Sequence, residues 1–168
     1  MKKTVSRAII VLAVLFLLIQ VIQPDRSNPP VTGDDVRQHL PVTPRVSEIL
    51  RTACFDCHSN ETRWPWYSYV APVSWLVSRD VSGGRRHVNF SMWATYDRRQ
   101  QIARLGGMAD EVEEGGMPLP IYVTMHAEAN LSSPDRDSLV AWARALRDTL
   151  VDQDRVERLR ARETESAE

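Results

Sequence analysis

The amino-acid sequence predicts an all-α fold, and two features of its 168 residues support this most directly. Apolar residues recur at helical spacing in two well-separated segments, and each segment begins with a hydroxyl side chain followed by proline, a common helix start. No segment alternates apolar and polar residues as a half-buried strand would, and no internal repeat is visible. The apolar positions are Val46, Ile49, Leu50 and Ala53 in the first segment, and Leu139, Val140, Ala143, Leu146 and Leu150 in the second.

A charged start followed by an apolar run predicts a single N-terminal transmembrane helix over residues 1–23. The basic residues are Lys2, Lys3 and Arg7, and the run that follows is interrupted only by Gln20. The run alone spans about 22 Å as a helix, and including the flanking polar residues brings it to roughly the 30 Å of a hydrocarbon core. With basic residues before the span, the N-terminus is expected in the cytoplasm.

Two other interpretations of this segment stay open in the sequence. A cleaved signal peptide has the same charged start, but no small-x-small cleavage site precedes Pro24, which favours an uncleaved anchor. A buried core helix is the other alternative. As an uncleaved anchor, the segment predicts a single-pass membrane protein, with everything after residue 23 on the extracytoplasmic side.

Residues 24–42 are rich in Pro, Ser, Asn and Gly and are expected to form a linker. One domain is expected over residues 43–151, because the chain is too short for two ordinary domains once its terminal segments are set aside. It begins with a helix capped by Thr43, with Pro44 in its first position.

The middle of this domain has weaker helical signals. Residues 63–93 are aromatic-rich and contain Gly83-Gly84, so short helices and loops are expected there. Residues 96–112 can form a helix that Gly106-Gly107 breaks or ends early. The glycines and prolines of residues 115–120 predict irregular structure.

The last helix is expected to begin with Ser133 as cap and Pro134 in its first position. After residue 151 the chain is dominated by charged residues, so residues 152–168 are expected to be a solvated helix extension or a disordered tail. Without Lys2, Lys3 and Arg7 the chain holds 18 basic and 22 acidic residues. This balance lacks the basic stripe of a nucleic-acid surface, so no nucleic-acid partner is expected.

Both cysteines of the chain lie in one short motif, Cys54-Phe55-Asp56-Cys57-His58. The pattern C-x-x-C-H is the attachment sequence of c-type haem. Two thiols one helical turn apart can each add to a vinyl group of the porphyrin edge, and the imidazole that follows becomes an iron ligand. The motif therefore predicts one covalent haem, bonded through Cys54 and Cys57 and ligated by His58.

Three other uses of the two cysteines must be weighed. A thioredoxin-type dithiol would follow a strand in a βαβ unit, and no such unit is visible. A zinc site needs a second pair of ligands, which would have to be distant histidines. A disulfide between residues three apart is strained and closes too small a loop to stabilise much.

Several blocks of sequence resemble the small bacterial haem-binding domain proteins with a single C-x-x-C-H. They are residues 53–62 (ACFDCHSNET), 65–67 (PWY), 71–75 (APVSW), 87–93 (HVNFSMW), 116–122 (GMPLPIY), His126 and 129–132 (ANLS). The resemblance extends from about residue 44 to about residue 142 and implies haem binding. The fold expected is an all-α, cytochrome c-like domain around one covalent haem, preceded by the transmembrane helix.

The sequence offers several candidates for a sixth iron ligand, and Met117 is preferred. Gly115 and Gly116 before it let the backbone pass close to the porphyrin, and Pro118 stiffens the chain after it. An open position is the remaining alternative. The other candidate side chains are His87, which is expected on the surface; His126, which would give bis-histidine ligation; Met108; and Met92 and Met125, for which core filling is expected.

These features and the resemblance predict an electron carrier of a respiratory chain, with haem c as cofactor and redox proteins as partners. It is expected to be anchored by a single span in a bacterial inner membrane, with its haem domain on the periplasmic side. Such a carrier is not itself an enzyme. A haem-based sensor or a peroxidase-like module with an open sixth position is the alternative. Arg85 and Arg86 are candidates to pair with the haem propionates, because guanidinium groups match carboxylates.

Overall fold

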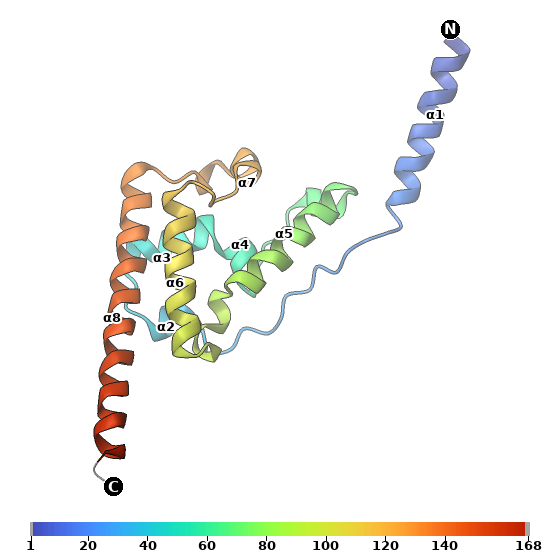
Figure 1. The fold of residues 1–168 in the computed structure, drawn as a ribbon. Coiled ribbons are helices and arrows are strands. Elements are labelled where there is room, and N and C mark those ends of the chain that lie inside the picture. Colours follow the sequence, from blue (N-terminus) through green and yellow to red (C-terminus); the bar gives the residue numbers. More distant parts are fainter. Residues whose placement is uncertain (1, 167–168) are drawn as a thin grey trace.

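The computed structural model describes residues 2–166, in which no strand forms, so the all-α prediction is confirmed. Helices follow one another along this part of the chain (Figure 1). They are α1 (Lys2–Ile19), α2 (Val36–His39), α3 (Pro44–Ala53), α4 (Phe55–His58), η1 (Trp66–Tyr69), α5 (Val73–His87), η2 (Phe90–Thr95), α6 (Arg98–Glu113), α7 (Pro120–Met125), η3 (Ala127–Ala129) and α8 (Ser133–Glu165), where η denotes a 3-10 helix.

The prediction of an N-terminal transmembrane helix is wrong. Among residues 2–166, no helix combines the length and the apolar character needed to cross a membrane. Helix α1 ends at Ile19, and its first turns carry Lys2, Lys3 and Arg7, so its apolar part is only about 18 Å long. The single-pass location in a bacterial inner membrane depended on this span and is wrong as well.

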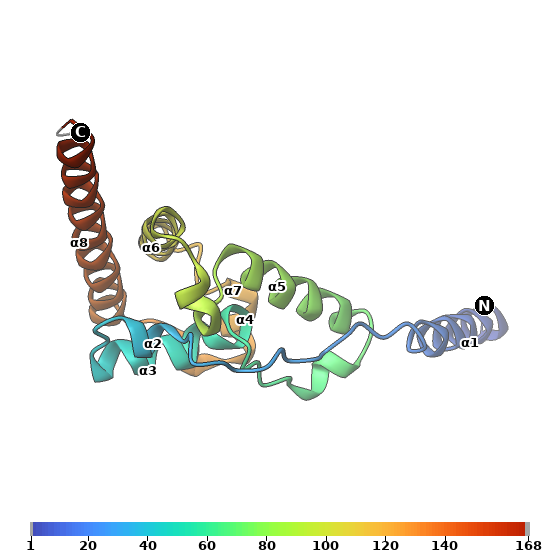
Figure 2. The ribbon, with the colours of Figure 1, turned by 90° about the horizontal axis from the view of Figure 1, so that it is seen from below.

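The helical run stops at Ile19 because the next residues pack on the main body. The side-chain amide of Gln20 donates to the carbonyl of Ala71 (3.1 Å) and accepts from its N–H (2.9 Å). The indole of Trp75 donates to the carbonyl of Ile22 (2.7 Å). Helix α1 itself stands apart from the other helices, joined to them by an extended segment (Figures 1 and 2).

The segment expected as a linker also contacts the body. Asn28 donates to the carbonyl of Thr62 (2.9 Å), and the carbonyl of Pro30 accepts from the Asn60 side chain (3.0 Å). Asp35 then caps α2 and is itself buried. Residues 27–36 are therefore held against the helices that follow.

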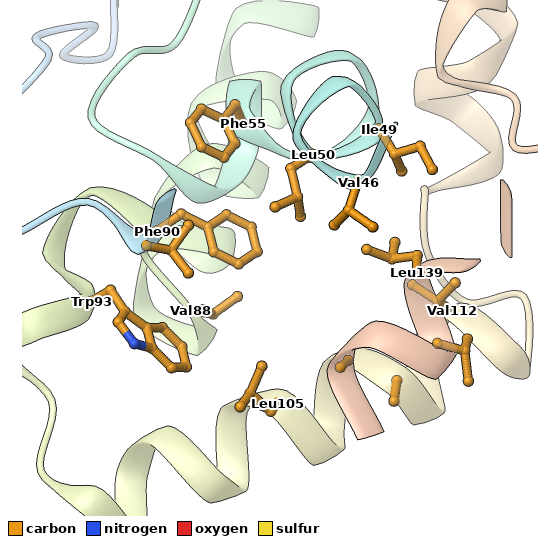
Figure 3. Close-up of a cluster of buried hydrophobic side chains, with 14 of the residues drawn as sticks. Val46, Ile49, Leu50, Phe55, Val88, Phe90, Trp93, Leu105, Val112 and Leu139 are labelled. Atoms are coloured by element: carbon orange, nitrogen blue, oxygen red, sulfur yellow. The ribbon is translucent and has the colours of Figure 1, made fainter. Parts of the chain in front are cut away.

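Helices α6 and α8 run antiparallel side by side and form one wall of the body (Figure 1). Helix α3 closes the core against them, with Val46, Ile49 and Leu50 facing Leu139 of α8 (Figure 3). Burying each such aliphatic side chain stabilises the fold by about 1.5–3 kcal/mol. The opposite side of the core is formed by Val88, Phe90, Trp93 and Leu105, and Val112 of α6 lies beside Leu139 (Figure 3).

The helix starts agree closely with expectation, whereas the helix breaks expected at the two glycine pairs do not occur. Thr43 caps α3 with Pro44 in the first position, and α8 starts one residue early, with Ser132 as cap. Helix α5 runs for 15 residues through Gly83-Gly84, and α6 runs unbroken through Gly106-Gly107. The short helices and loops expected in residues 63–93 therefore occur at η1 and η2, whereas the expectation is wrong for α5, because tertiary packing overrides local propensity there.

Candidate functional site

The C-x-x-C-H motif lies at a break between two helices. Helix α3 ends at Ala53, and Cys54 adopts a non-helical conformation (φ −125°, ψ −40°) before α4 begins. The carbonyl of Cys54 accepts from the N–H groups of Cys57 (3.1 Å) and His58 (2.9 Å). One helical turn therefore carries both thiols and the imidazole, as the motif predicts.

The imidazole of His58 is oriented by the backbone. Its Nδ1 hydrogen-bonds the carbonyl of Val88 (3.1 Å), and its ring lies 6.2 Å from that of Phe90. Burial lowers the pKa of His58, and the carbonyls of Val88 and Gly84 offset part of this effect. A neutral imidazole whose Nδ1 is hydrogen-bonded to a carbonyl is the form in which histidine ligates a metal through Nε2.

Helix α5 passes very close to the motif, and Gly84 makes this approach possible. A Cβ atom at Gly84 would lie 2.5 Å from the carbonyl oxygen of Cys57 and 3.2 Å from its Cβ. Only glycine leaves room for this contact, which places the C-terminal half of α5 beside α4 and delivers Val88 to His58.

The segment that follows α4 and the segment that follows α5 are hydrogen-bonded to each other. The side chain of Asn89 donates to the side chain of Asn60 (2.8 Å), and the N–H of Asn60 donates to the hydroxyl of Ser91 (3.0 Å). All three residues are buried. The segment that orients His58 is therefore held by the residues just after the motif.

A buried carboxylate inside the motif organises the other side of α4. Asp56 accepts from the Arg63 guanidinium (3.0 and 3.2 Å) and from the hydroxyl of Tyr122 in α7 (2.8 Å). Burial, and then the Asp56 carboxylate, raise the pKa of Tyr122, which keeps the phenol a donor. Sequence reasoning did not single out this pair, because residues 56 and 122 are joined only by the fold.

The same network engages His126, which was an alternative sixth ligand. Its Nε2 hydrogen-bonds the hydroxyl of Tyr67 (2.6 Å), and its Nδ1 hydrogen-bonds the carboxylate of Glu128 (3.2 Å). Its ring stacks on Tyr122 at 4.2 Å. Both ring nitrogens are occupied, so His126 has a structural role in this arrangement.

Two other predicted positions have clear surroundings. Arg85 donates to the carbonyls of Ser59 (2.8 Å) and Ser27 (3.3 Å), and to the side chains of Asn28 (2.7 Å) and Thr62 (2.9 Å). Its guanidinium is thus used to hold the extended segment against the loop after α4. His87 is exposed at the end of α5, as expected, and Arg86 beside it is exposed too.

Met117 lies in the connection from α6 to α7, half-buried against the core. The chain leaves α6 at Gly115, whose φ of +79° suits glycine, and Met117 then donates its N–H to the carbonyl of Glu111 (3.0 Å). Met117 lines a pocket of about 300 Å³ with Leu131 and Arg136, among others. The lining of that pocket does not include Cys54, Cys57 or His58.

The other methionines differ from expectation in part. Met92 and Met125 are 41% and 56% exposed, so the expectation that they fill the core is wrong. Met108, on α6, is half-buried against the core.

The surroundings of the two thiols lend no support to the dithiol and zinc alternatives. Burial raises the pKa of Cys54 and of Cys57 to about 12, whereas a reactive dithiol needs a lowered value. Among residues 2–166, no three His, Cys, Asp or Glu side chains gather in a way that could hold a metal ion, so the zinc alternative gains no support. The buried indole N–H of Trp64 lacks an acceptor within the same residues, and a haem propionate is an acceptor of the right kind.

Comparison with known protein families identifies a relationship for most of the chain. A family model described as "Haem-binding domain" matches residues 14–145, which include the motif, its contacts with α5 and the Met117 connection. No curated protein and no solved structure matches the chain.

Proposed function

Because the chain belongs to the haem-binding domain family and binds haem, we propose that it is a c-type cytochrome that carries one covalent haem for one-electron transfer. The observation that carries the proposal is the single turn that bears Cys54, Cys57 and His58, with Nδ1 of His58 already hydrogen-bonded to a backbone carbonyl. This hydrogen bond fixes the ring and directs Nε2 to a metal.

Each residue of the turn has a separate role in this proposal. Cys54 and Cys57 would hold the porphyrin edge through thioethers, and His58 would ligate the iron. When bound, haem supplies a reversible change between ferrous and ferric iron. The chain supplies burial and orientation: Phe90 packs beside His58, and Gly84 brings α5 against Cys57.

Met117 is our proposed sixth ligand. It is half-buried, whereas Met92 and Met125 are exposed, and His126 has both ring nitrogens occupied. A thioether ligand together with an imidazole would favour ferrous iron and raise the reduction potential, which suits an electron carrier. Its partners would then be redox proteins that exchange single electrons with it.

A second function rests on one observation about Met117. The pocket that Met117 lines has no wall formed by Cys54, Cys57 or His58, so the pocket does not itself bring the thioether to His58. If Met117 does not ligate the iron, the sixth position is open, and a sensor or peroxidase-like module is the function that follows.

The covalent attachment is tested by intact-mass measurement. The wild-type chain, produced in a host that has haem-attachment machinery, should carry the added mass of one haem after denaturation. Cys54→Ala and Cys57→Ala should each reduce this adduct, because each thioether needs its own thiol, and the double variant should abolish it. A wild-type chain whose haem is lost completely on denaturation would contradict the c-type proposal while leaving haem binding intact.

A further inference from the structure

The peptide group between Val88 and Asn89 connects His58 to a tyrosine that no motif includes. The carbonyl of this peptide accepts from Nδ1 of His58 (3.1 Å), and its N–H donates to the hydroxyl of Tyr96 (2.9 Å). The two hydrogen bonds lie at opposite ends of one amide. Because an amide is conjugated, an acceptor at its N–H makes its carbonyl oxygen a better acceptor.

Tyr96 is itself firmly placed. Its ring packs edge-to-face with that of Trp93, with centroids 6.0 Å apart, and the guanidinium carbon of Arg104 lies 4.0 Å from the centroid of the Tyr96 ring. Arg104 also donates to the carbonyl of His87. One arginine of α6 therefore holds both the tyrosine and the backbone one residue before Val88.

We propose that Tyr96, supported by Arg104, is a positioning residue for His58. It holds the Val88–Asn89 peptide so that the Val88 carbonyl meets the Nδ1–H of His58 and increases the basicity of the imidazole. The inference rests on the proposed function, because it takes His58 as the iron ligand. A more basic imidazole stabilises ferric iron, so Tyr96 lowers the midpoint potential.

The test is Tyr96→Phe in the haem-loaded chain, which removes one oxygen and keeps the ring contacts. Tyr69→Phe is the matched control, since Tyr69 also has an arginine over its ring (Arg26, 4.3 Å) but no hydroxyl partner among residues 2–166. Tyr96→Phe should raise the midpoint potential of the haem. It should also speed hydrogen exchange of the His58 ring N–H, which paramagnetic proton NMR measures. Tyr69→Phe should change neither.

Arg104→Gln provides an independent variant should Tyr96→Phe fail to fold, and it should shift both readouts in the same direction by a smaller amount. If Tyr96 has a purely structural role, Tyr96→Phe lowers the melting temperature but leaves the midpoint potential and the exchange of the His58 ring N–H at wild-type values. That result overturns the proposal. His58→Ala distinguishes a failure of the role of Tyr96 from a failure of the proposed function. If the iron spectrum of His58→Ala equals that of the wild type, His58 is not the ligand, and both the proposed function and the role of Tyr96 are refuted.

Discussion

His58 and His126 show how the same side chain acquires two roles through its hydrogen bonds. His58 uses Nδ1 for the carbonyl of Val88, which leaves Nε2 for a ligand. His126 uses both nitrogens, for Tyr67 and Glu128. The sequence shows only that both are histidines. The local motif sufficed to single out His58, but the partners of His126 are 59 residues away in one case and 2 in the other, so its role required the fold.

Met117→Ala is the substitution that most directly tests the sixth ligand. If the thioether ligates the iron, its removal opens the site, so carbon monoxide should bind the reduced variant readily and the wild type poorly. Absorption spectra of the reduced proteins, with and without carbon monoxide, measure this difference.

Two control substitutions make the Met117 result specific. Met92→Ala should behave as the wild type, because Met92 is 41% exposed. His126→Phe retains an aromatic ring to stack on Tyr122 and should also leave the iron spectrum unchanged. Rapid binding of carbon monoxide by the wild type, with no change in Met117→Ala, would instead favour the sensor or peroxidase-like function.

At the scale of elements, α5 is where local sequence rules failed for a physical reason. Adjacent glycines cost a helix about 1 kcal/mol each relative to alanine, so Gly83-Gly84 predicts an end or a break. The helix nevertheless continues to His87, because Gly84 lets its backbone meet that of Cys57. The glycine pair is visible in the sequence, but its role depends on a contact with Cys57, 27 positions before Gly84.

The glycine pair provides a matched test of this packing. Gly84→Ala would place a Cβ 2.5 Å from the carbonyl oxygen of Cys57, so α5 must shift, and overpacking should cost about 1–3 kcal/mol of unfolding free energy. Gly83→Ala meets nothing closer than the Arg86 guanidinium at 3.8 Å and should stabilise the helix by about 0.5–1 kcal/mol. Urea unfolding followed by circular dichroism distinguishes the two. Equal unfolding free energies of the two variants would show that the close contact of α5 with Cys57 is not needed for the stability of the fold.

At the scale of the whole molecule, the sequence predicted most where structure is decided locally. The caps of α3 and α8 and the spacing of their buried residues require no distant partner, and these predictions succeeded to within one residue. The end of α1 was missed because it is determined by the contact between Gln20 and Ala71, 51 positions apart. The apolar run alone could not reveal that its last residues pack on the body.

Helix α8 contains a buried part and an exposed part that contribute unequally to stability. Its last buried residue is Leu150, 6% exposed, and beyond it the helix continues to Glu165 in solvent. The contacts of this extension with α6 are few: Arg98 hydrogen-bonds Gln153 (2.9 Å) and lies 3.8 Å from Glu157. Exposed contacts of this kind are worth about 0–1 kcal/mol.

Truncation after residue 152 should therefore change the unfolding free energy by less than about 1 kcal/mol and leave the haem spectrum unaltered. Leu150→Ala in the full chain should instead cost about 2–5 kcal/mol, because it opens a cavity where α8 meets the core. Thermal unfolding followed at the haem absorption band and by far-ultraviolet circular dichroism measures both variants. If truncation destabilised the protein as much as Leu150→Ala does, the extension would have to be part of the folded core rather than a solvated continuation of the helix.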